Sequence, residues 1–157
     1  MADALRLVDV NPAAPSDLAA LASLHARAFE KPWRAQDFAA LFTPGAWAWL
    51  AFQGASAVGL VFVRSVVDEA EVLTLAVAPS ARRCGVAQRL LKKAIAAMAG
   101  HGVIDLWLEV AETNLAALAL YQGLGFQPAG RRSGYYSGEG PPVDAVILRL
   151  LLNSAPG

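Results

Sequence analysis

The sequence has little cysteine, no long hydrophobic run and no excess of charge of either sign. Its single cysteine, Cys84, excludes an intramolecular disulfide and a zinc site built from several cysteines. Although 56% of the 157 residues are hydrophobic, no window reaches the roughly 18 uninterrupted apolar residues of a membrane-spanning helix. With 13 basic and 13 acidic residues, the chain lacks the broad positive charge of a nucleic-acid-binding surface. We therefore expect neither a membrane nor a nucleic acid among its partners.

The N-terminus, MADALRLVDV, has no basic leader and no apolar segment followed by a small-residue cleavage site. This favours a cytoplasmic location. The length is typical of one compact domain, which we expect residues 1–157 to form. No metal-ligand cluster is recognisable, so we expect no metal.

Hydrophobic periodicity predicts the order β-α-α-β-β-β-α-β-α-β-β. Strands are expected at residues 4–10, 46–53, 57–67, 69–77, 103–110, 126–132 and 143–152, and helices at 14–29, 34–42, 87–100 and 114–126. We expect the strands within 46–77 to form an antiparallel meander and residues 69–126 to form a βαβα unit with parallel strands. The fold class is therefore α/β (α+β), a mixed sheet with helices on both faces. Only residues 133–142 and the last few residues are expected to be flexible.

The junction between the strand at 69–77 and the helix after it has the composition of a phosphate-binding site. Gly85 and Ala87 lack bulk, so the backbone N–H groups of residues 83–88 can approach a ligand closely. A helix N-terminus also carries roughly half a positive charge, to which Arg82 and Arg83 add full charges. The chain lacks the Gly-Lys-Ser/Thr of a nucleotide-hydrolysing loop and the full Gly-x-Gly-x-x-Gly of a dinucleotide fold. A pyrophosphate that is held but not cleaved fits better, and an ordinary turn with solvated arginines is the alternative.

The pattern Arg82-x-x-Gly85-x-Ala87 resembles the coenzyme A loop (Q/R-x-x-G-x-G/A) of the GNAT acetyltransferase superfamily. The likeness covers most of residues 15–150, through AFEKPW, DEAEVLTLAVAPSARRCGVAQRLL, LWLEV, NLAALALYQGLGF and YY…DAVIL. This succession is similar to the RimI-type enzymes, which acetylate the N-terminal alanine of a ribosomal protein. The resemblance implies a GNAT-like sheet and an acyltransferase that moves acetyl directly from acetyl-CoA to a protein N-terminus in a ternary complex. An acetyltransferase for lysine side chains or small amines, or a non-catalytic coenzyme A-binding module, remains an alternative.

The resemblance also implies which residues bind acetyl-CoA. The backbone N–H groups near Leu75–Val77 would donate to the oxyanion of the tetrahedral intermediate. Cys84 occupies a variable position of the loop, and direct transfer needs no enzyme nucleophile, so we expect no acetyl-cysteine intermediate. The full expected set is Leu75, Ala76, Val77, Arg82, Arg83, Cys84, Gly85, Val86, Ala87, Gln88 and Asn114.

Glu109 is the candidate general base. Strand parity groups it with Asp105 and Trp107 and opposes it to the apolar residues between them. A carboxylate at the C-terminal end of a parallel strand beside a cofactor loop is well placed for this role, which the match to LWLEV also implies. A solvated carboxylate is the plain alternative, and Glu71 is the reserve candidate for the base.

Tyr121 is the candidate acid that protonates departing coenzyme A, again by resemblance. Asn114 lies seven residues before it, so the two residues share one edge of a helix. Asn114 as a plain helix cap and Tyr121 as a packing residue are the alternatives. The family shapes its peptide channel with aromatic residues, here Trp33, Tyr135 and Tyr136, which could equally pack a loop onto the body.

The acceptor amine must be neutral to attack the thioester. At pH 7, deprotonation costs about 1.4 kcal/mol for an α-amine with a pKa near 8, and about 4.6 kcal/mol for a lysine near 10.4. This favours an α-amine weakly, because a desolvating site can lower the pKa of a lysine. The sequence identifies neither the acceptor nor the oligomeric state.

Overall fold

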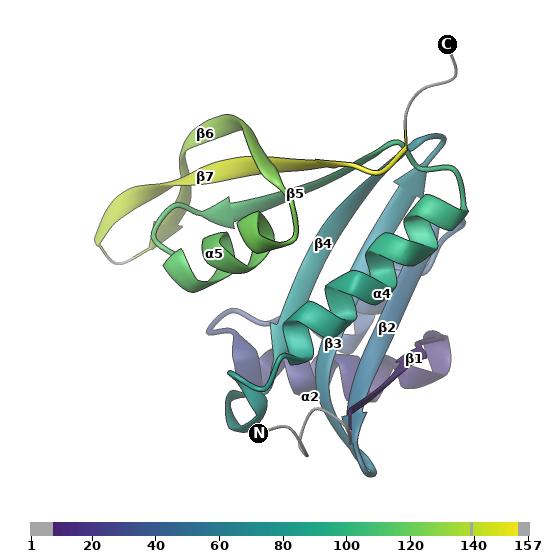
Figure 1. Cartoon of the computed structure of the whole chain (residues 1–157). Coiled ribbons are helices and arrows are strands. Elements are labelled where there is room, and N and C mark those ends of the chain that lie inside the picture. Colours follow the sequence, from purple (N-terminus) through teal and green to yellow (C-terminus); the bar gives the residue numbers. More distant parts are fainter. Residues whose placement is uncertain (1–7, 139, 154–157) are drawn as a thin grey trace.

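The computed structural model describes residues 8–138 and 140–153 (Figure 1). The strands are β1 (Val8–Pro12), β2 (Ala46–Gln53), β3 (Ser56–Val66), β4 (Glu69–Val77), β5 (Asp105–Ala111), β6 (Gln127–Gly138) and β7 (Gly140–Leu151). The helices are α2 (Leu18–Ala28), α3 (Ala35–Leu41), α4 (Val86–Gly100) and α5 (Leu115–Gly123), with 3₁₀ turns η1 (Pro15–Asp17) and η2 (Pro79–Ala81). The expected order of strands and α-helices is confirmed.

The strands form one sheet in the order β1-β2-β3-β4-β5-β7-β6. Neighbouring strands are antiparallel except β4 and β5, which pair in parallel. The mixed sheet, the meander of β2, β3 and β4, and the parallel pair joined through α4 are all as the sequence predicts.

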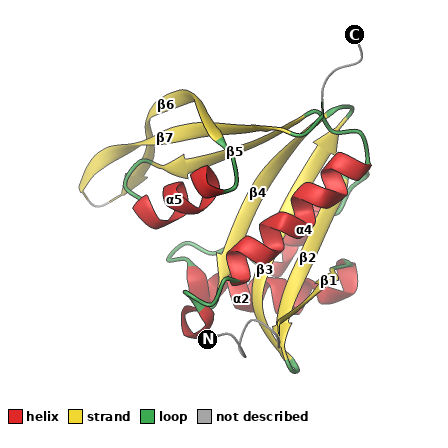
Figure 2. Cartoon of the chain, viewed as in Figure 1, coloured by secondary structure: helices red, strands yellow, loops and turns green. Residues whose placement is uncertain are grey.

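Helices cover both faces of the sheet (Figure 2). Strand β3 supplies both cores, because its successive side chains point to opposite faces. Val61 and Val63 belong to the cluster that α4 and α5 cover, whereas Leu60 and Phe62 pack in the cluster under α2 and α3. This two-sided burial explains the nearly continuous apolar run of β3.

Strands β4 and β5 pair only at their first residues and then separate. The pairing runs from Glu69 opposite Asp105 to Glu71 opposite Trp107. Beyond that point the register between β3 and β4 shifts and leaves Leu73 as an extra residue in β4. A bulge bends its strand, and Figure 1 shows β4 and β5 running apart after their shared start. One edge of β4 therefore faces an opening in the sheet.

The start of α4 lies close against the sheet at Gly59 of β3. A Cβ atom at this position would lie 2.7 Å from Val86 Cγ1 and 2.9 Å from Leu90 Cδ1. Both side chains are buried, so glycine is what allows the helix and strand to approach this closely. The contact fixes the first turn of α4 beside the end of β4.

Most predicted boundaries differ from the structure by one to several residues, and three of the differences lie in the first strand, the first helix and the strand at 103–110. The first strand is Val8–Pro12, and residues 4–7 of the predicted strand lie outside the described residues. The segment at 14–29 divides into η1 and α2. The strand predicted at 103–110 begins at Asp105, because the Val103 N–H still donates to Met98 O at the end of α4.

The prediction of a flexible segment at 133–142 is wrong for its described residues. They belong to the β6–β7 hairpin, in which Tyr136 pairs with Val143 and Gly138 pairs with Gly140. Two of the three register shifts between β6 and β7 lie in this segment and accommodate its glycines and prolines, and its exposed edge tolerates their missing or blocked hydrogen bonds. Across the described part of the chain, no helix is long and apolar enough to cross a membrane.

Candidate active site

The junction before α4 forms an open helix N-terminus. After η2, the chain turns through Arg83 and Gly85, whose φ angles of 63° and 74° are left-handed. Gly85 is the N-cap of this 15-residue helix and has no side chain that could accept the N–H groups of the first turn. The N–H groups of that turn are therefore available to an anion. With Arg82 and Arg83 exposed beside it, the junction fits a phosphate-bearing ligand.

The end of β4 lines the opening in the sheet. Leu75, Ala76 and Val77 pair with β3 on one edge, opposite Val61, Leu60 and Gly59. Their other edge lies beyond the last residue pair with β5. This is the stretch in which we expect backbone donors for an oxyanion.

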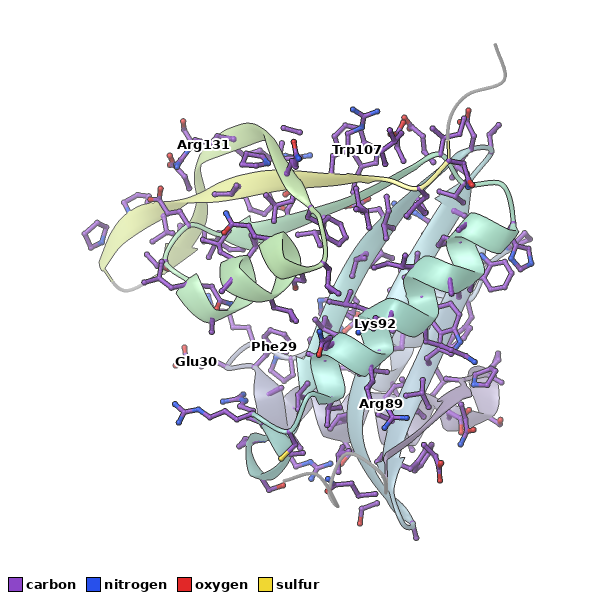
Figure 3. The ribbon with its side chains drawn as sticks, in the orientation of Figure 1. Phe29, Glu30, Arg89, Lys92, Trp107 and Arg131 are labelled. Carbon is purple, nitrogen blue, oxygen red and sulfur yellow. The ribbon has the colours of Figure 1, made fainter. Side chains whose placement is uncertain are left out.

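Glu109 lies on the wall of the opening that β5 provides. Strand parity is as predicted, because Leu108 and Val110 are buried on the α5 side and Glu109 shares the other face with Asp105 and Trp107. Trp107, labelled in Figure 3, projects from β5 on the side away from α5. The Glu109 side chain is only 19% exposed, and its Oε1 lies 2.9 Å from Arg132 Nη2. The ion pair was not anticipated from the sequence.

Tyr121 lies on α5 and is 8% exposed. Its ring packs against Phe126, with a centroid separation of 5.8 Å. Burial, with a smaller contribution from the neighbouring Tyr136 phenol, raises the pKa of Tyr121 to about 12. The phenol therefore carries its proton at neutral pH and can act as a hydrogen-bond or proton donor.

Tyr136 connects the two candidate catalytic residues. Burial raises the pKa of the Tyr136 phenol, as do the charge of Glu109 and, to a smaller extent, Tyr135. Because Tyr136 also raises the pKa of Tyr121, its phenol lies within electrostatic reach of each candidate catalytic residue. Tyr135 packs edge-on against Tyr136 at 5.1 Å and is 53% exposed. Tyr136 is thus the residue that interacts with both Glu109 and Tyr121.

Asn114 and Trp33 both have clear structural contacts. Asn114 is exposed and caps α5, accepting a hydrogen bond from the Ala117 N–H at 3.2 Å. The Trp33 ring packs against His25 at 5.1 Å and Phe38 at 5.4 Å. These contacts support the packing alternatives, and the ligand roles of both residues stay predictions.

His25 is part of the core. The Trp33 N–H donates to His25 Nδ1 at 2.9 Å, so the ring proton lies on Nε2, which donates to Thr74 Oγ1 at 3.0 Å. The residue is 3% exposed, and burial lowers its pKa to about 4. His25 is therefore neutral at pH 7, and its contacts give it a structural role.

The remaining candidates are Glu71 and Cys84. Glu71 is the last residue of β4 that pairs with β5, and its Oε2 lies 3.9 Å from Arg64 Nη2. Cys84 is half-buried, and its Sγ lies 3.6 Å from Arg82 O. Within the residues that the structure describes, no three His, Cys, Asp or Glu side chains gather as a metal site would require.

Sequence reasoning missed Gly59 and Arg132. Gly59 lies inside a predicted strand, where an isolated glycine signals a close backbone approach. The glycine therefore indicates a close contact with another element, but it does not identify that element as α4. Arg132 carries no such signal, because its position depends on the irregular pairing of β6 with β7.

Comparisons with known proteins agree with this geometry. The acetyltransferase (GNAT) family matches residues 18–126. The [ribosomal protein bS18]-alanine N-acetyltransferase of Escherichia coli K12 is 34% identical over 135 residues, which cover 86% of this chain and 91% of that enzyme. Its Salmonella typhimurium counterpart is 42% identical over 85 residues, 54% of this chain and 57% of that enzyme.

Solved structures show the same fold. The crystal structure of the E. coli ribosomal-protein-S18-alanine N-acetyltransferase matches with a TM-score of 0.90 and 32% identity, over 95% of this chain and 96% of that one. Arabidopsis thaliana NAA60 in complex with acetyl-CoA matches with a TM-score of 0.81 and 21% identity, over 94% and 99%, which supports the fold alone. The chain belongs to the GNAT family of N-acetyltransferases.

Proposed function

We propose that this enzyme transfers acetyl from acetyl-CoA to the N-terminal α-amine of a protein, with a ribosomal protein that begins with alanine as its acceptor. The observation that carries the proposal is the opening between β4 and β5, with a helix N-terminus capped by Gly85 after β4 and with Glu109 on β5 beyond the point where the two strands separate. The acceptor class rests on the similarity to the bS18-alanine N-acetyltransferases.

The junction before α4 would hold the pyrophosphate of acetyl-CoA. The first-turn N–H groups and the left-handed Gly85 provide donors at close approach, and Arg82 and Arg83 supply positive charge. The free edge of β4 at Leu75–Val77 would hydrogen-bond the substrate and the oxyanion that develops during transfer.

Glu109 would accept the proton of the acceptor amine, directly or through a water. Its partly buried carboxylate keeps some contact with solvent, which suits a group that must pass a proton onward. At pH 7, deprotonation of an α-amine costs about 3 kcal/mol less than deprotonation of a lysine, so the α-amine needs a weaker base.

Tyr121 would donate to the departing sulfur. Transfer of its proton to a free thiolate of ordinary basicity costs about 5 kcal/mol, because the phenol pKa of about 12 lies well above the ordinary thiol value of about 8.5. Burial of the sulfur also raises the thiol pKa, which reduces the difference between the pKa values of the phenol and the thiol. Tyr121 therefore acts best as a hydrogen-bond donor while the carbon–sulfur bond breaks.

One peptide tests the acceptor class. It begins with alanine, contains one internal lysine, and is incubated with enzyme and acetyl-CoA before fragmentation by mass spectrometry. We expect acetyl on the α-amine and none on the lysine. Acetyl on lysine alone would remove the proposed acceptor class and favour the lysine or small-amine alternative.

Two variants test the choice of base. Glu109→Gln is expected to lower kcat by about 100-fold or more, in the range typical of lost general base catalysis. Glu71→Gln is the matched control on β4 and should retain activity. If Glu71→Gln loses activity and Glu109→Gln keeps it, Glu71 is the base. If both variants keep full activity, neither carboxylate is the base.

A further inference from the structure

We propose that Arg132 is a positioning residue for acetyl transfer, which holds the Glu109 carboxylate by one oxygen and keeps the acceptor amine neutral beside it. The inference rests on the proposed role of Glu109 as the base. It assigns a function to the one ion pair that the structure shows at the Glu109 side chain.

The proposal rests on the position of the Arg132 side chain, which extends across one strand of the sheet to Glu109. Arg132 is on β6 and Glu109 is on β5, with β7 between them. Arg132 pairs with Ala145, which in turn pairs with Ala111, so these three side chains point to one face. Because the intervening residue has only a methyl group, the guanidinium can extend over β7 to Glu109 Oε1 at 2.9 Å.

The aromatic residues next to Arg132 restrict its guanidinium. The group lies 5.3 Å from the centre of the Tyr135 ring, a distance typical of cation–π contacts. Tyr135 packs in turn against Tyr136, and the charge of Glu109 raises the pKa of the Tyr136 phenol. One guanidinium thus contacts the candidate base and an aromatic residue of the expected peptide channel.

A bulge in the β6–β7 hairpin positions Arg132, Tyr135 and Tyr136. Between the pairs Arg132–Ala145 and Tyr136–Val143, β6 has three residues where β7 has only Asp144. Asp144 holds this bulge, because its Oδ1 accepts the Gly134 N–H at 2.8 Å and Gly134 has a left-handed φ of 60°.

A second set of contacts ties the bulge to β5. Arg131 Nη1 donates to Glu112 Oε2 at 2.6 Å and to Asp144 Oδ2 at 3.2 Å. Glu112 directly follows β5, so the network links the bulge to the strand that carries Glu109. Bulges commonly re-aim side chains next to active sites.

The ion pair suits a catalytic task better than a stabilising one. The Arg132 side chain is 55% exposed, and half-exposed pairs add little to stability. Arg132 Nη2 engages Oε1 and leaves Oε2 for a water or the amine. A guanidinium beside the carboxylate also repels an ammonium, so the site favours the amine after it has lost its proton.

The test is a double-mutant cycle on full-length enzyme with the alanine-starting peptide. Arg132→Gln is expected to lower kcat about tenfold and leave the KM for acetyl-CoA unchanged. Because Arg132 acts through Glu109, Arg132→Gln should have little further effect in the Glu109→Gln background. Arg149→Gln is the matched control, since it removes the Arg149–Asp105 pair from the same face of β5 and β7.

Chemical rescue separates positioning from folding. Added guanidinium ion, at concentrations that leave the wild type folded, should restore part of the kcat of Arg132→Ala and none in Arg149→Ala. Unchanged or increased kcat in Arg132→Gln, additive losses in the cycle, or a loss without rescue would each overturn the proposal. The same cycle also contains the single variant Glu109→Gln. Full activity of that variant would instead overturn the choice of Glu109 as the base.

Discussion

Gly59→Ala should weaken both the fold and the binding of acetyl-CoA. The new Cβ would lie 2.7 Å from Val86 Cγ1 and 2.9 Å from Leu90 Cδ1, about 1 Å inside the usual contact distance of carbon atoms. Both side chains are at most 1% exposed, so neither can turn into solvent. Relief of the overlap requires the first turn of α4 to move away from β3.

The expected loss follows from the balance of two effects. Overpacking of this kind costs about 1–3 kcal/mol, and the lower conformational entropy of alanine in the unfolded chain returns about 0.4–1 kcal/mol. We expect a net loss of about 1–2 kcal/mol, with about 2–4 °C in Tm for each kcal/mol in a chain of this size. Because Val86 directly follows the Gly85 cap, the KM for acetyl-CoA should rise several-fold.

Urea unfolding and initial-rate kinetics measure the two effects. Gly100→Ala is the control, because it changes a glycine of the same helix that has nothing within 4 Å of an added Cβ; it should leave the KM unchanged. Val86→Ala should cost less stability in the Gly59→Ala background than in the wild type. Unchanged stability and KM in Gly59→Ala, or equal costs of Val86→Ala in both backgrounds, would refute the reasoning.

Three further predictions concern Tyr121, Cys84 and His25. Tyr121→Phe should lower kcat by about 10²-fold or more, as for other lost proton donors, with a Tm close to the wild type; an unchanged kcat would remove Tyr121 from the chemistry. Cys84→Ala should keep kcat within a factor of two if acetyl passes directly to the amine, and intact protein mass spectrometry during turnover should find no acetyl-enzyme. His25 has a folded pKa of about 4, below its unfolded value of 6.5, so the unfolded chain binds more protons between these values and stability should fall by up to about 3 kcal/mol as pH drops from 6.5 to 4. Urea unfolding at several pH values checks this, and an equal slope in His25→Gln would contradict it.

The sequence predicts the order of the elements because hydrophobic periodicity is a local signal. The strand-like runs of β2–β4 and the turn residues between them predict the meander, and the spacing of Leu90, Leu91, Ala94 and Met98 predicts the buried face of α4. Glu109 was placed on the correct face by strand parity alone. Each of these features depends on a single element and its immediate neighbours.

Features that depend on register could not be predicted in this way. The opening between β4 and β5 requires the bulge at Leu73, which no residue type marks. The contact between Arg132 and Glu109 depends on a hairpin whose pairing shifts at three places, and a shift of one residue moves a side chain to the other face. Glycine and proline in 133–142 predicted flexibility, yet the hydrogen bond from Gly134 to Asp144 holds this segment in the hairpin.

The two halves of the sheet contribute different parts of the proposed reaction. The half that ends at β4 offers backbone donors and a helix N-terminus, groups whose charge does not change near neutral pH. The half that begins at β5 carries Glu109, Tyr121 and Tyr136, whose side chains can accept or donate a proton, and Arg132, which pairs with Glu109. Because strand pairing between the described residues of these halves is limited to Glu69–Glu71 with Asp105–Trp107, we expect this short parallel contact to help set the distance between the bound thioester and its base. Substitutions that change this pairing should alter kcat more than either binding constant.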